Sequence, residues 1–299
     1  MLNTFEVFKN EIQKKAACRK VLLWNADDAG WLRILTQYHS QGLVDCTLLG
    51  DRSAVELAAQ EASLNLGSHK IVSSGSLEES IAYIKKCLEE KSIDILIRGN
   101  VGIRDSLRAL LKTEVGFKPN KKAVVSGLSC HYVSDIERLL IVSDPIVNPA
   151  PDLNRKIAIV NNAVAFANKL GGGDPRVALL AAVEAVYPVM QHTLEGAAIA
   201  KMNDRGQIKG CLVDGPLSMD CAVIESAAKS KGVKGEVGGF ANVLIAPNIE
   251  TGYGMNKAFA KFVGAPTASL VVGGRIPYVV TSRWDSDNTK ENSLLLAML

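Results

Sequence analysis

The chain has 299 residues, of which 47% are hydrophobic and 22% charged, the composition of a globular protein rather than a disordered one. The formal net charge of +3 is too small for the clustered basic surface of a nucleic-acid-binding protein. No apolar run approaches the roughly 18 residues that a membrane helix needs, and Glu6 and Glu11 interrupt the apolar core of any signal peptide. We therefore expect a cytoplasmic protein with neither a nucleic-acid nor a membrane partner.

Short apolar runs predict seven strands. Runs that are apolar throughout, rather than alternating, are typical of strands covered on both faces. The predicted strands are residues 21–24, 93–97, 139–142, 177–180, 211–213, 242–245 and 269–272. A further strand is expected at 123–125, after a polar break at 118–122.

Helical patterns fall between these runs. The clearest begins with Asp152 as its cap, repeats apolar residues at steps of three and four, and stops at the glycines 171–173. A second is predicted from about Asp220 to Lys231, with Gly232 ending it. Strands and helices in alternation predict an α/β fold with a mostly parallel sheet and helices on both sides.

Several types of site are not predicted. The six cysteines form no Cys-x-x-Cys pair and the four histidines have no metal-ligand spacing, so no metal is expected. Cys130 and His131 are neighbours, but adjacent residues in a strand point to opposite faces and make a poor nucleophile–base pair. The sequence has no GxGxxG, GxxxxGK[ST], GxSxG or HExxH motif, which argues against standard dehydrogenases, P-loop enzymes, α/β-hydrolases and zinc peptidases.

Polar residues follow several predicted strands at their carboxyl ends, where such sheets bind ligands. They are Arg98, Asp144, Asn148, Asp214 with Gly215 and Pro216, and Thr281-Ser282-Arg283. The last group precedes a helix, and a helix N-terminus with an arginine can bind phosphate. Lys257 is expected in the first turn of a helix that follows Gly252 and Gly254. Each of these features has a plainer interpretation as a turn or a helix cap. A basic run of Lys229, Lys231 and Lys234 is either a solvated face or a contact with a phosphorylated ligand.

Four segments together resemble one protein family. Residues 201–217 with Asp220, residues 143–148 with 151–152, and residues 241–248 are similar to the phosphate acetyl/butyryl transferases. Residues 281–286, continuing through Thr289 and Lys290, resemble the phosphate butyryltransferase branch in particular. The similarity extends from about Ile93 to the end of the chain.

The resemblance implies a reaction and a fold. The reaction is acyl-CoA plus phosphate giving acyl phosphate plus CoA, by direct transfer in a ternary complex, with butyryl or another short-chain acyl group. Coenzyme A thioester is then a substrate, and no bound cofactor is implied. The fold is a two-domain isocitrate/isopropylmalate dehydrogenase-like α/β architecture with the active-site cleft between the domains, usually as a homodimer. We place domain I at 1–131 plus 275–299 and domain II at 132–274.

The resemblance also implies site residues. The catalytic Ser-Arg pair of the family corresponds to Ser282 and Arg283, and Asp285 matches the butyryl branch as a candidate base for the thiol proton. Asp285 could instead only cap the next helix. The substrate-binding positions implied or inferred from strand ends are Arg98, Arg108, Asp144, Asn148, Asp214, Gly215, Pro216 and Lys257.

Two other interpretations stay open. A dehydrogenase of the same broad fold is the enzymatic rival, although the missing cofactor motif and the Ser-Arg pair argue against it. A catalytically weak relative that binds CoA or acyl phosphate is the other, because Ile103, Tyr253 and Thr289 depart from residues common in the family.

Overall fold

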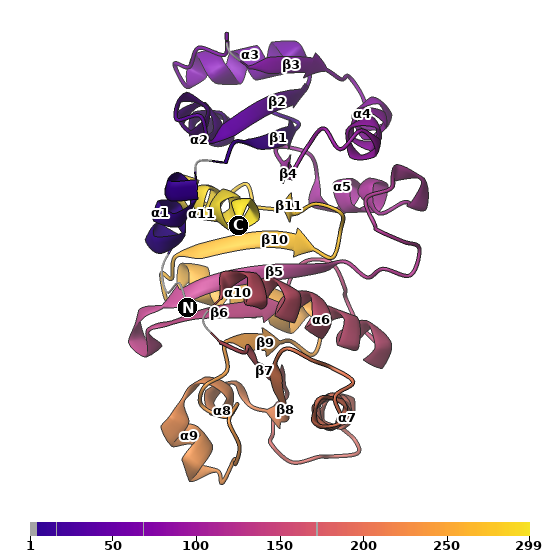
Figure 1. Ribbon diagram of the computed structural model, residues 1–299, viewed down its shortest axis with the longest axis vertical. Helices are drawn as coiled ribbons and strands as arrows, with labels where there is room; N and C mark the ends of the chain where they lie inside the picture. The colour runs from indigo at the N-terminus through magenta and orange to yellow at the C-terminus, as the bar shows by residue number, and fades with distance from the viewer. Residues whose placement is uncertain (1–4, 16, 68, 172) are drawn as a thin grey trace. The chain divides into compact units, whose positions relative to one another are not determined.

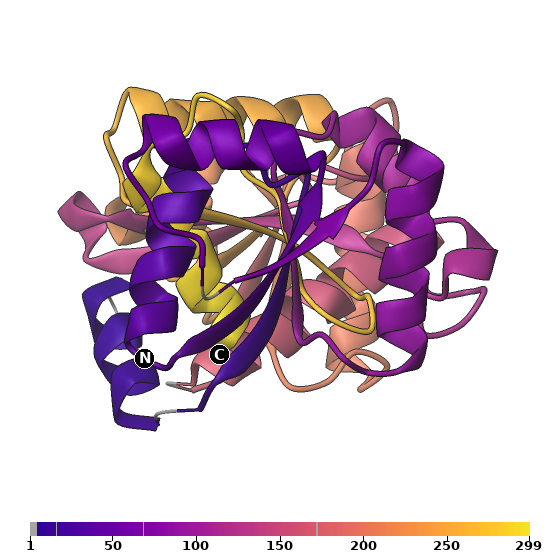
Figure 2. The same cartoon turned by 90° about the horizontal axis from the view of Figure 1, so that it is seen from above.

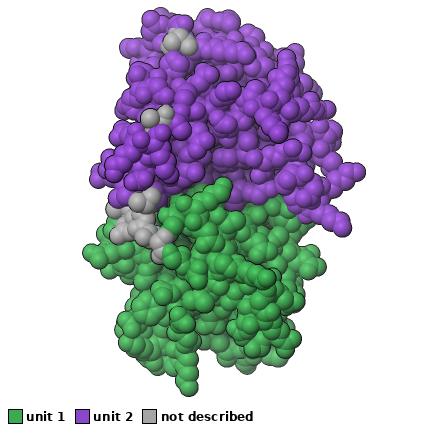
Figure 3. Space-filling view, in the orientation of Figure 1, with its two compact units in different colours: residues 1–4, 124–267 green, residues 5–123, 268–299 purple. Residues whose placement is uncertain are grey.

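The computed structural model describes residues 5–15, 17–67, 69–171 and 173–299. It contains two compact units, which Figure 3 shows in different colours: unit 1 is residues 124–267, and unit 2 joins residues 5–123 to residues 268–299. The predicted domain boundaries, after residues 131 and 274, each fall slightly further along the chain. None of the described helices is both long and apolar enough to cross a membrane.

Unit 2 has strands in the order β3-β2-β1-β4-β11-β10, parallel except for the pair β10–β11. Figures 1 and 2 show α2 on one side of β1 and β2 and α4 on the other. The strands are β1 (Arg19–Trp24), β2 (Val44–Gly50), β3 (Lys70–Ser73), β4 (Ile95–Arg98), β10 (Thr267–Val272) and β11 (Tyr278–Val279). The helices are α1 (Phe5–Lys15), α2 (Ala29–Ser40), α3 (Arg52–Glu61), α4 (Leu77–Glu89), α5 (Ile103–Leu110) and α11 (Asp287–Met298), with a 3₁₀ turn η1 at Thr113–Val115.

Unit 1 has strands in the order β5-β6-β9-β7-β8, parallel except for the pair β5–β6. One hydrophobic cluster joins Leu140, Ala178 and Leu244 of the strands to Cys221 of α8 and Phe259 of α10. The strands are β5 (Ser126–Val133), β6 (Arg138–Ser143), β7 (Arg176–Leu180), β8 (Leu212–Leu217) and β9 (Val243–Ile245). The helices are α6 (Leu153–Leu170), α7 (Gln191–Asp204), α8 (Met219–Val223), α9 (Glu225–Ser230) and α10 (Ile249–Lys261), with a 3₁₀ turn η2 at Ser134–Ile136.

The seven predicted strands all form, and the predicted α/β class with mostly parallel strands is confirmed. The strand expected at 123–125 is wrong in position, because residues 123–125 are irregular and β5 begins at Ser126. The carbonyl groups of Val124 and Val125 instead accept side-chain hydrogen bonds from Asn162 and Asn148. Strands β2 and β3 were not predicted, and β11 was expected only as a strand that ends before Thr281.

The predicted helix at 152–171 is confirmed as α6. Asp152 is its N-cap and accepts the Arg155 backbone N–H at 2.8 Å, and Gly171 follows its last residue. Gly172, part of the predicted stop, lies outside the described residues.

The predicted single helix at 220–231 is wrong, because Ile224 has extended backbone and separates α8 from α9. In a continuous helix the carbonyls of Cys221 and Ala222 would accept from N–H groups four residues later. Here they accept from Gly239 and Ala241, at 2.7 and 3.0 Å. Hydrogen bonds with a distant segment therefore break the helix.

The prediction that Gly252 and Gly254 precede a helix is also wrong, because both lie inside α10. The N-cap is Asn248, whose side chain accepts the Thr251 N–H at 2.9 Å. A Cβ atom at Gly252 would lie 2.6 Å from the Asp144 carbonyl oxygen, so glycine permits a close backbone approach here rather than a turn. Lys257 is accordingly in the third turn of α10, not the first.

Candidate active site

Residues 281–286, which we name the Arg283 turn, follow β11 in unit 2. The Asp285 N–H donates to the Ser282 carbonyl at 3.1 Å, and the Asp285 carboxylate accepts the Ser282 N–H at 2.8 Å. These two bonds make a tight turn with Arg283 and Trp284 at its central positions. Ser286 then caps α11 by accepting the Thr289 N–H at 3.2 Å. The hydroxyl of Ser282 is therefore not needed as the helix cap.

Arg98 and Arg283 hold each other's loops in place. Arg98, at the end of β4, is buried and donates to the carbonyls of Val101 and Thr281. Arg283 is exposed, and its Nη2 donates to the Asn100 carbonyl at 3.0 Å. Burial lowers the pKa of Arg98, and the charge of Arg283 contributes to the lowering. Within the described part of the chain, neither guanidinium forms an ion pair with a carboxylate.

Further polar residues lie at the same edge of unit 2, and sequence reasoning missed Asp27 and Asp28 among them. Asn100 donates from Nδ2 to the Asp27 carbonyl at 2.7 Å and to its carboxylate at 3.1 Å. The buried Lys290 of α11 contacts the Asp28 carboxylate at 2.6 Å, and Asp28 also caps α2. Asp27 and Asp28 follow the predicted strand 21–24, so the rule that selected Arg98 and Arg283 could have found them.

Asp144 and Asn148, predicted to bind substrate, both turn inward in unit 1. The Asp144 carboxylate accepts the N–H groups of Ile146 and Val147 at 2.7 and 2.9 Å, and the Asn148 Nδ2 at 2.6 Å. Burial raises the pKa of Asp144, and these hydrogen bonds oppose the rise. Among the described residues, their contacts stabilise the loop after β6, in keeping with the interpretation of these residues as part of a turn.

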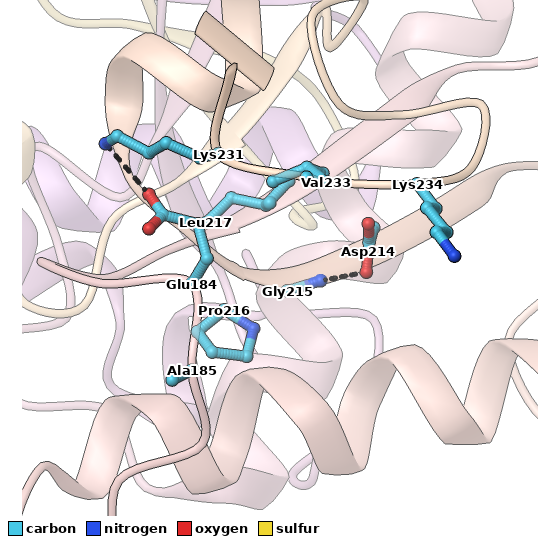
Figure 4. Close-up of a pocket in the computed structure, with 10 residues that line it drawn as sticks. Glu184, Ala185, Asp214, Gly215, Pro216, Leu217, Lys231, Val233 and Lys234 are labelled. Atoms are coloured by element: carbon cyan, nitrogen blue, oxygen red, sulfur yellow. Dashed lines mark hydrogen bonds and ion pairs between the residues drawn. The ribbon is translucent and has the colours of Figure 1, made fainter. Parts of the chain in front are cut away.

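Asp214, Gly215 and Pro216 line a cavity of about 520 Å³ in unit 1, which Figure 4 shows. The Asp214 carboxylate accepts the Gly215 N–H at 2.8 Å, and burial raises the pKa of Asp214. A Cβ at Gly215 would lie 2.6 Å from the Leu179 Cβ, so only glycine fits against β7. The opposite wall carries Lys231 and Lys234, two members of the predicted basic run.

Glu184, Ser218, Asp220 and Lys231 form what we name the carboxylate–lysine cluster. The Lys231 Nζ lies 3.2 Å from Glu184 Oε1 and 3.1 Å from Asp220 Oδ2, and the Ser218 hydroxyl contacts both carboxylates. The Ser218 contact and Lys231 lower the pKa of Glu184 and of Asp220 to about 2 each. Cys221 brings a third potential metal ligand near these carboxylates. The Lys231 ammonium already supplies positive charge beside both carboxylates and therefore competes with any metal ion for them.

The other predicted lysine and arginine positions lie on helices. Lys257 Nζ lies 5.6 Å from the centre of the Tyr253 ring, one turn earlier in α10. Arg108 is exposed on α5 and forms no hydrogen bond or ion pair with any residue the structure describes. Lys229 pairs with Glu225 at 2.6 Å on the surface of α9, which fits a solvated face. The structure does not bring Arg108 and Arg283 together through any contact.

Cys130 and His131 do not form a catalytic pair. His131 is buried between the hydroxyls of Thr267 and Ser129, each 3.0 Å from a ring nitrogen. Burial, helped by the charge of Lys257, lowers the pKa of His131 to about 3, so the ring is neutral. Burial raises the pKa of the Cys130 thiol well above its usual range. An inert buried thiol cannot serve as the nucleophile.

Comparison with known proteins places this chain in a family. The family model described as phosphate acetyl/butaryl transferase matches residues 86–298. A phosphate butyryltransferase from Clostridium acetobutylicum is 36% identical over 299 residues, covering 100% of this chain and 98% of the relative. The chain belongs to the phosphate acetyl/butyryl transferase family.

Solved structures agree with this assignment. A branched-chain phosphotransacylase from Enterococcus faecalis V583 superposes with a TM-score of 0.80 at 25% identity, covering 94% of this chain and 98% of that one. A phosphotransacetylase from Streptococcus pyogenes, at 15% identity and a TM-score of 0.82, shows likeness of fold. As a phosphate acetyl/butyryl transferase the chain is an acyltransferase enzyme with the expected dehydrogenase-like α/β fold. The dehydrogenase and weak-binding alternatives are not favoured.

Proposed function

We propose that this phosphate acyltransferase converts a short-chain acyl-CoA, such as butyryl-CoA, and phosphate into acyl phosphate and CoA. The observation that carries the proposal is the exposed Arg283 guanidinium, fixed by a neutral carbonyl and therefore keeping its full charge for an anion. Arginine presents a planar fork that matches phosphate. The relative named phosphate butyryltransferase, which aligns over the whole chain, supports butyryl as the acyl group.

Arg98 has a supporting part in this proposal. Two of its nitrogens donate to the carbonyls of Val101 and Thr281, and the side chain is buried. It therefore holds the start of the Arg283 turn rather than presenting its own charge to solvent. We propose that Arg98 acts on phosphate through the position of Arg283, while exposed Arg108 remains a second candidate ligand.

The chemistry is direct transfer. A phosphate oxygen attacks the thioester carbon, the C–S bond breaks, and the proton of hydrogen phosphate ends on the sulfur of CoA. The Ser282 hydroxyl stands beside Arg283 and can donate to the carbonyl oxygen, where negative charge develops, or to the leaving sulfur. A covalent enzyme intermediate is not needed. Asp285, next to Trp284, is our candidate for carrying the proton to and from sulfur.

The cavity in unit 1 is our candidate contact for coenzyme A. Gly215 and Pro216 offer backbone and an apolar ring at its wall, and Lys234 offers a charge for a phosphate group of the nucleotide. Lys257 is proposed as a further contact, and Asp144 and Asn148 as the frame of the loop after β6. Replacing Lys234 with methionine should raise the KM for acyl-CoA without changing that for phosphate.

We also propose that the enzyme works in the cytoplasm as a homodimer without a bound cofactor. Unit 1 exposes several large apolar side chains around the start of α7, among them Val186, Tyr187 and Val189, which suits a surface covered by a second copy. Sedimentation velocity at micromolar concentration tests the dimer. A monomer at that concentration contradicts it.

One assay tests the activity. The protein is incubated with butyryl-CoA and phosphate, thiol release is followed with a thiol-reactive dye, and acyl phosphate is trapped as a hydroxamate. We expect both products in equal amounts and dependent on phosphate. Thiol release without acyl phosphate would show a thioesterase, and no release above an Arg283→Ala control would refute the proposed function.

A further inference from the structure

Trp284 is a large apolar side chain left almost fully in solvent beside the proposed phosphate ligand. Its side chain is 89% exposed, whereas the chain's other two tryptophans, Trp24 and Trp31, are completely buried. Ile103, the first residue of α5, is also exposed, at 42%. Single exposed apolar residues are ordinary, so their positions decide whether these two matter.

Both residues are close in the chain to the groups that fix the Arg283 guanidinium. Trp284 is the next residue, and the Ser282–Asp285 turn fixes its backbone through two hydrogen bonds at 2.8 and 3.1 Å. Ile103 lies three residues after Asn100 in the chain. The Asn100 carbonyl oxygen accepts a hydrogen bond from Arg283 Nη2 at 3.0 Å. The two apolar side chains thus come from the two segments that the Arg98 and Arg283 contacts join.

We infer that Trp284, supported by Ile103, is the surface against which the acyl chain packs, and that it selects butyryl over acetyl thioesters. This inference rests on the proposed function. Attack requires the acyl carbon to lie ~3–3.5 Å from a phosphate oxygen, and Arg283 holds that phosphate. The reaction therefore brings one apolar part of the substrates, the acyl chain, close to Arg283. The adenine of CoA lies at the far end of the pantetheine arm and has no such constraint.

The size of the selection follows from the hydrophobic effect. Burying one methylene group changes binding about 4-fold, and butyryl has two methylenes more than acetyl, so complete burial favours butyryl by about 15-fold. An open turn covers only part of the chain. We expect Trp284 to contribute roughly 5- to 15-fold to the ratio of kcat/KM for butyryl-CoA over acetyl-CoA.

The test measures that ratio in variants of the full-length protein. In Trp284→Ala the ratio should fall roughly 5- to 15-fold, because kcat/KM for butyryl-CoA falls more than that for acetyl-CoA, and Trp284→Phe should keep most of the ratio. Ile103→Thr should lower it less. Phe262→Ala is the matched control, because Phe262 is 90% exposed at the end of α10 in unit 1, and its ratio should not move.

A second readout needs no turnover. Because Trp284 is the one exposed tryptophan of the three, acrylamide quenching of tryptophan fluorescence reports on it. Butyryl-CoA should protect it from quenching more than acetyl-CoA or free CoA does, and the protection should vanish in Trp284→Ala. Equal losses for both thioesters, or equal protection by free CoA, would place Trp284 against CoA itself and overturn the inference. If the wild type transfers neither acyl group, the proposed function fails instead.

Discussion

The two units hold their positive charges differently. In the Arg283 turn of unit 2, backbone carbonyls fix Arg98 and Arg283. In the carboxylate–lysine cluster of unit 1, Glu184 and Asp220 fix Lys231. A carbonyl dipole positions a cation without cancelling its charge, whereas two carboxylates more than neutralise it. The difference teaches that an anion should bind at the Arg283 turn and not at Lys231, although each region presents a cation to solvent.

The largest effect is expected where a carboxylate-paired lysine is buried. Lys156 and Glu195 of unit 1 lie 2.5 Å apart with side chains 3% and 7% exposed. Glu195→Gln leaves a buried ammonium uncompensated, so the free energy of unfolding in urea should fall by ~3–5 kcal/mol. Asp204→Asn, which breaks the exposed Lys201 pair at 2.7 Å, should cost less than ~1 kcal/mol. Equal losses would show that burial does not set the value of such pairs.

The Asp285 carboxylate accepts the Ser282 N–H in the Arg283 turn. Its negative charge can be removed while this hydrogen bond is kept. Asp285→Asn keeps an oxygen for the Ser282 N–H but removes the negative charge. We expect kcat in the CoA-consuming direction to fall by ~10²-fold at neutral pH. The loss should shrink as pH approaches the usual thiol pKa of ~8.5, because the thiolate then forms unaided. A pH-independent loss with a lowered Tm would make Asp285 a turn residue only.

A pair of variants tests the difference between Arg283 and Lys231 in anion binding. Arg283→Ala should lower kcat/KM for phosphate by roughly 10- to 150-fold, the value of a charge-assisted contact, and Arg283→Lys should recover part of it. Lys231→Met should leave phosphate kinetics within about 2-fold, because its charge is already paired. Similar losses in the two variants would abolish the distinction between the regions.

The carboxylate–lysine cluster should make the Tm of the protein depend on pH in the acid range. The folded state lowers the pKa of Glu184 and Asp220 to about 2 each, below their usual values of 4.5 and 3.8. Their stabilising contribution is complete above those usual values and is lost as pH falls toward 2. Lys231→Met should therefore lower Tm at pH 6, and its gap from the wild type should narrow by pH 3. A gap that does not depend on pH would remove the ion pairs as its cause.

Removal of metal ions is expected to have no effect on activity or stability. With Lys231 beside both carboxylates of the cluster, dialysis against a strong chelator should leave thiol release and Tm unchanged. Activity lost on dialysis and restored by zinc or magnesium would show that the cluster, which also includes Cys221, holds a metal.

The fold could be predicted from sequence where local patterns decide it. Mostly apolar runs marked seven strands, and Asp152 marked the start of α6. β11 has only two residues, so the sequence indicated where it ends but not its extent. The break at Ile224 depends on the N–H groups of Gly239 and Ala241, which a local helical pattern does not reveal.

The candidate site was predictable in outline. Reading the residues after each strand selected Arg98 and Arg283, but only the structure shows that Arg98 is buried and Arg283 exposed. Which of the two arginines faces solvent depends on the carbonyls that each one meets, and for each arginine at least one of these comes from the other loop. The roles of the individual site residues stay predictions.

The division of the chain affects the order in which the protein can form during translation. Unit 1 is contiguous, so all of residues 124–267 are available before the ribosome reaches α11. Unit 2 must wait, because β10, β11 and the buried leucines 294–296 of α11 are made after unit 1. Until then β4 lacks its neighbour β11, and the early half of unit 2 presents an open strand edge. This early half is therefore the part of the chain that we expect chaperones to engage, and the Arg283 turn, which comes after unit 1 in the chain, joins it only once unit 1 has been made.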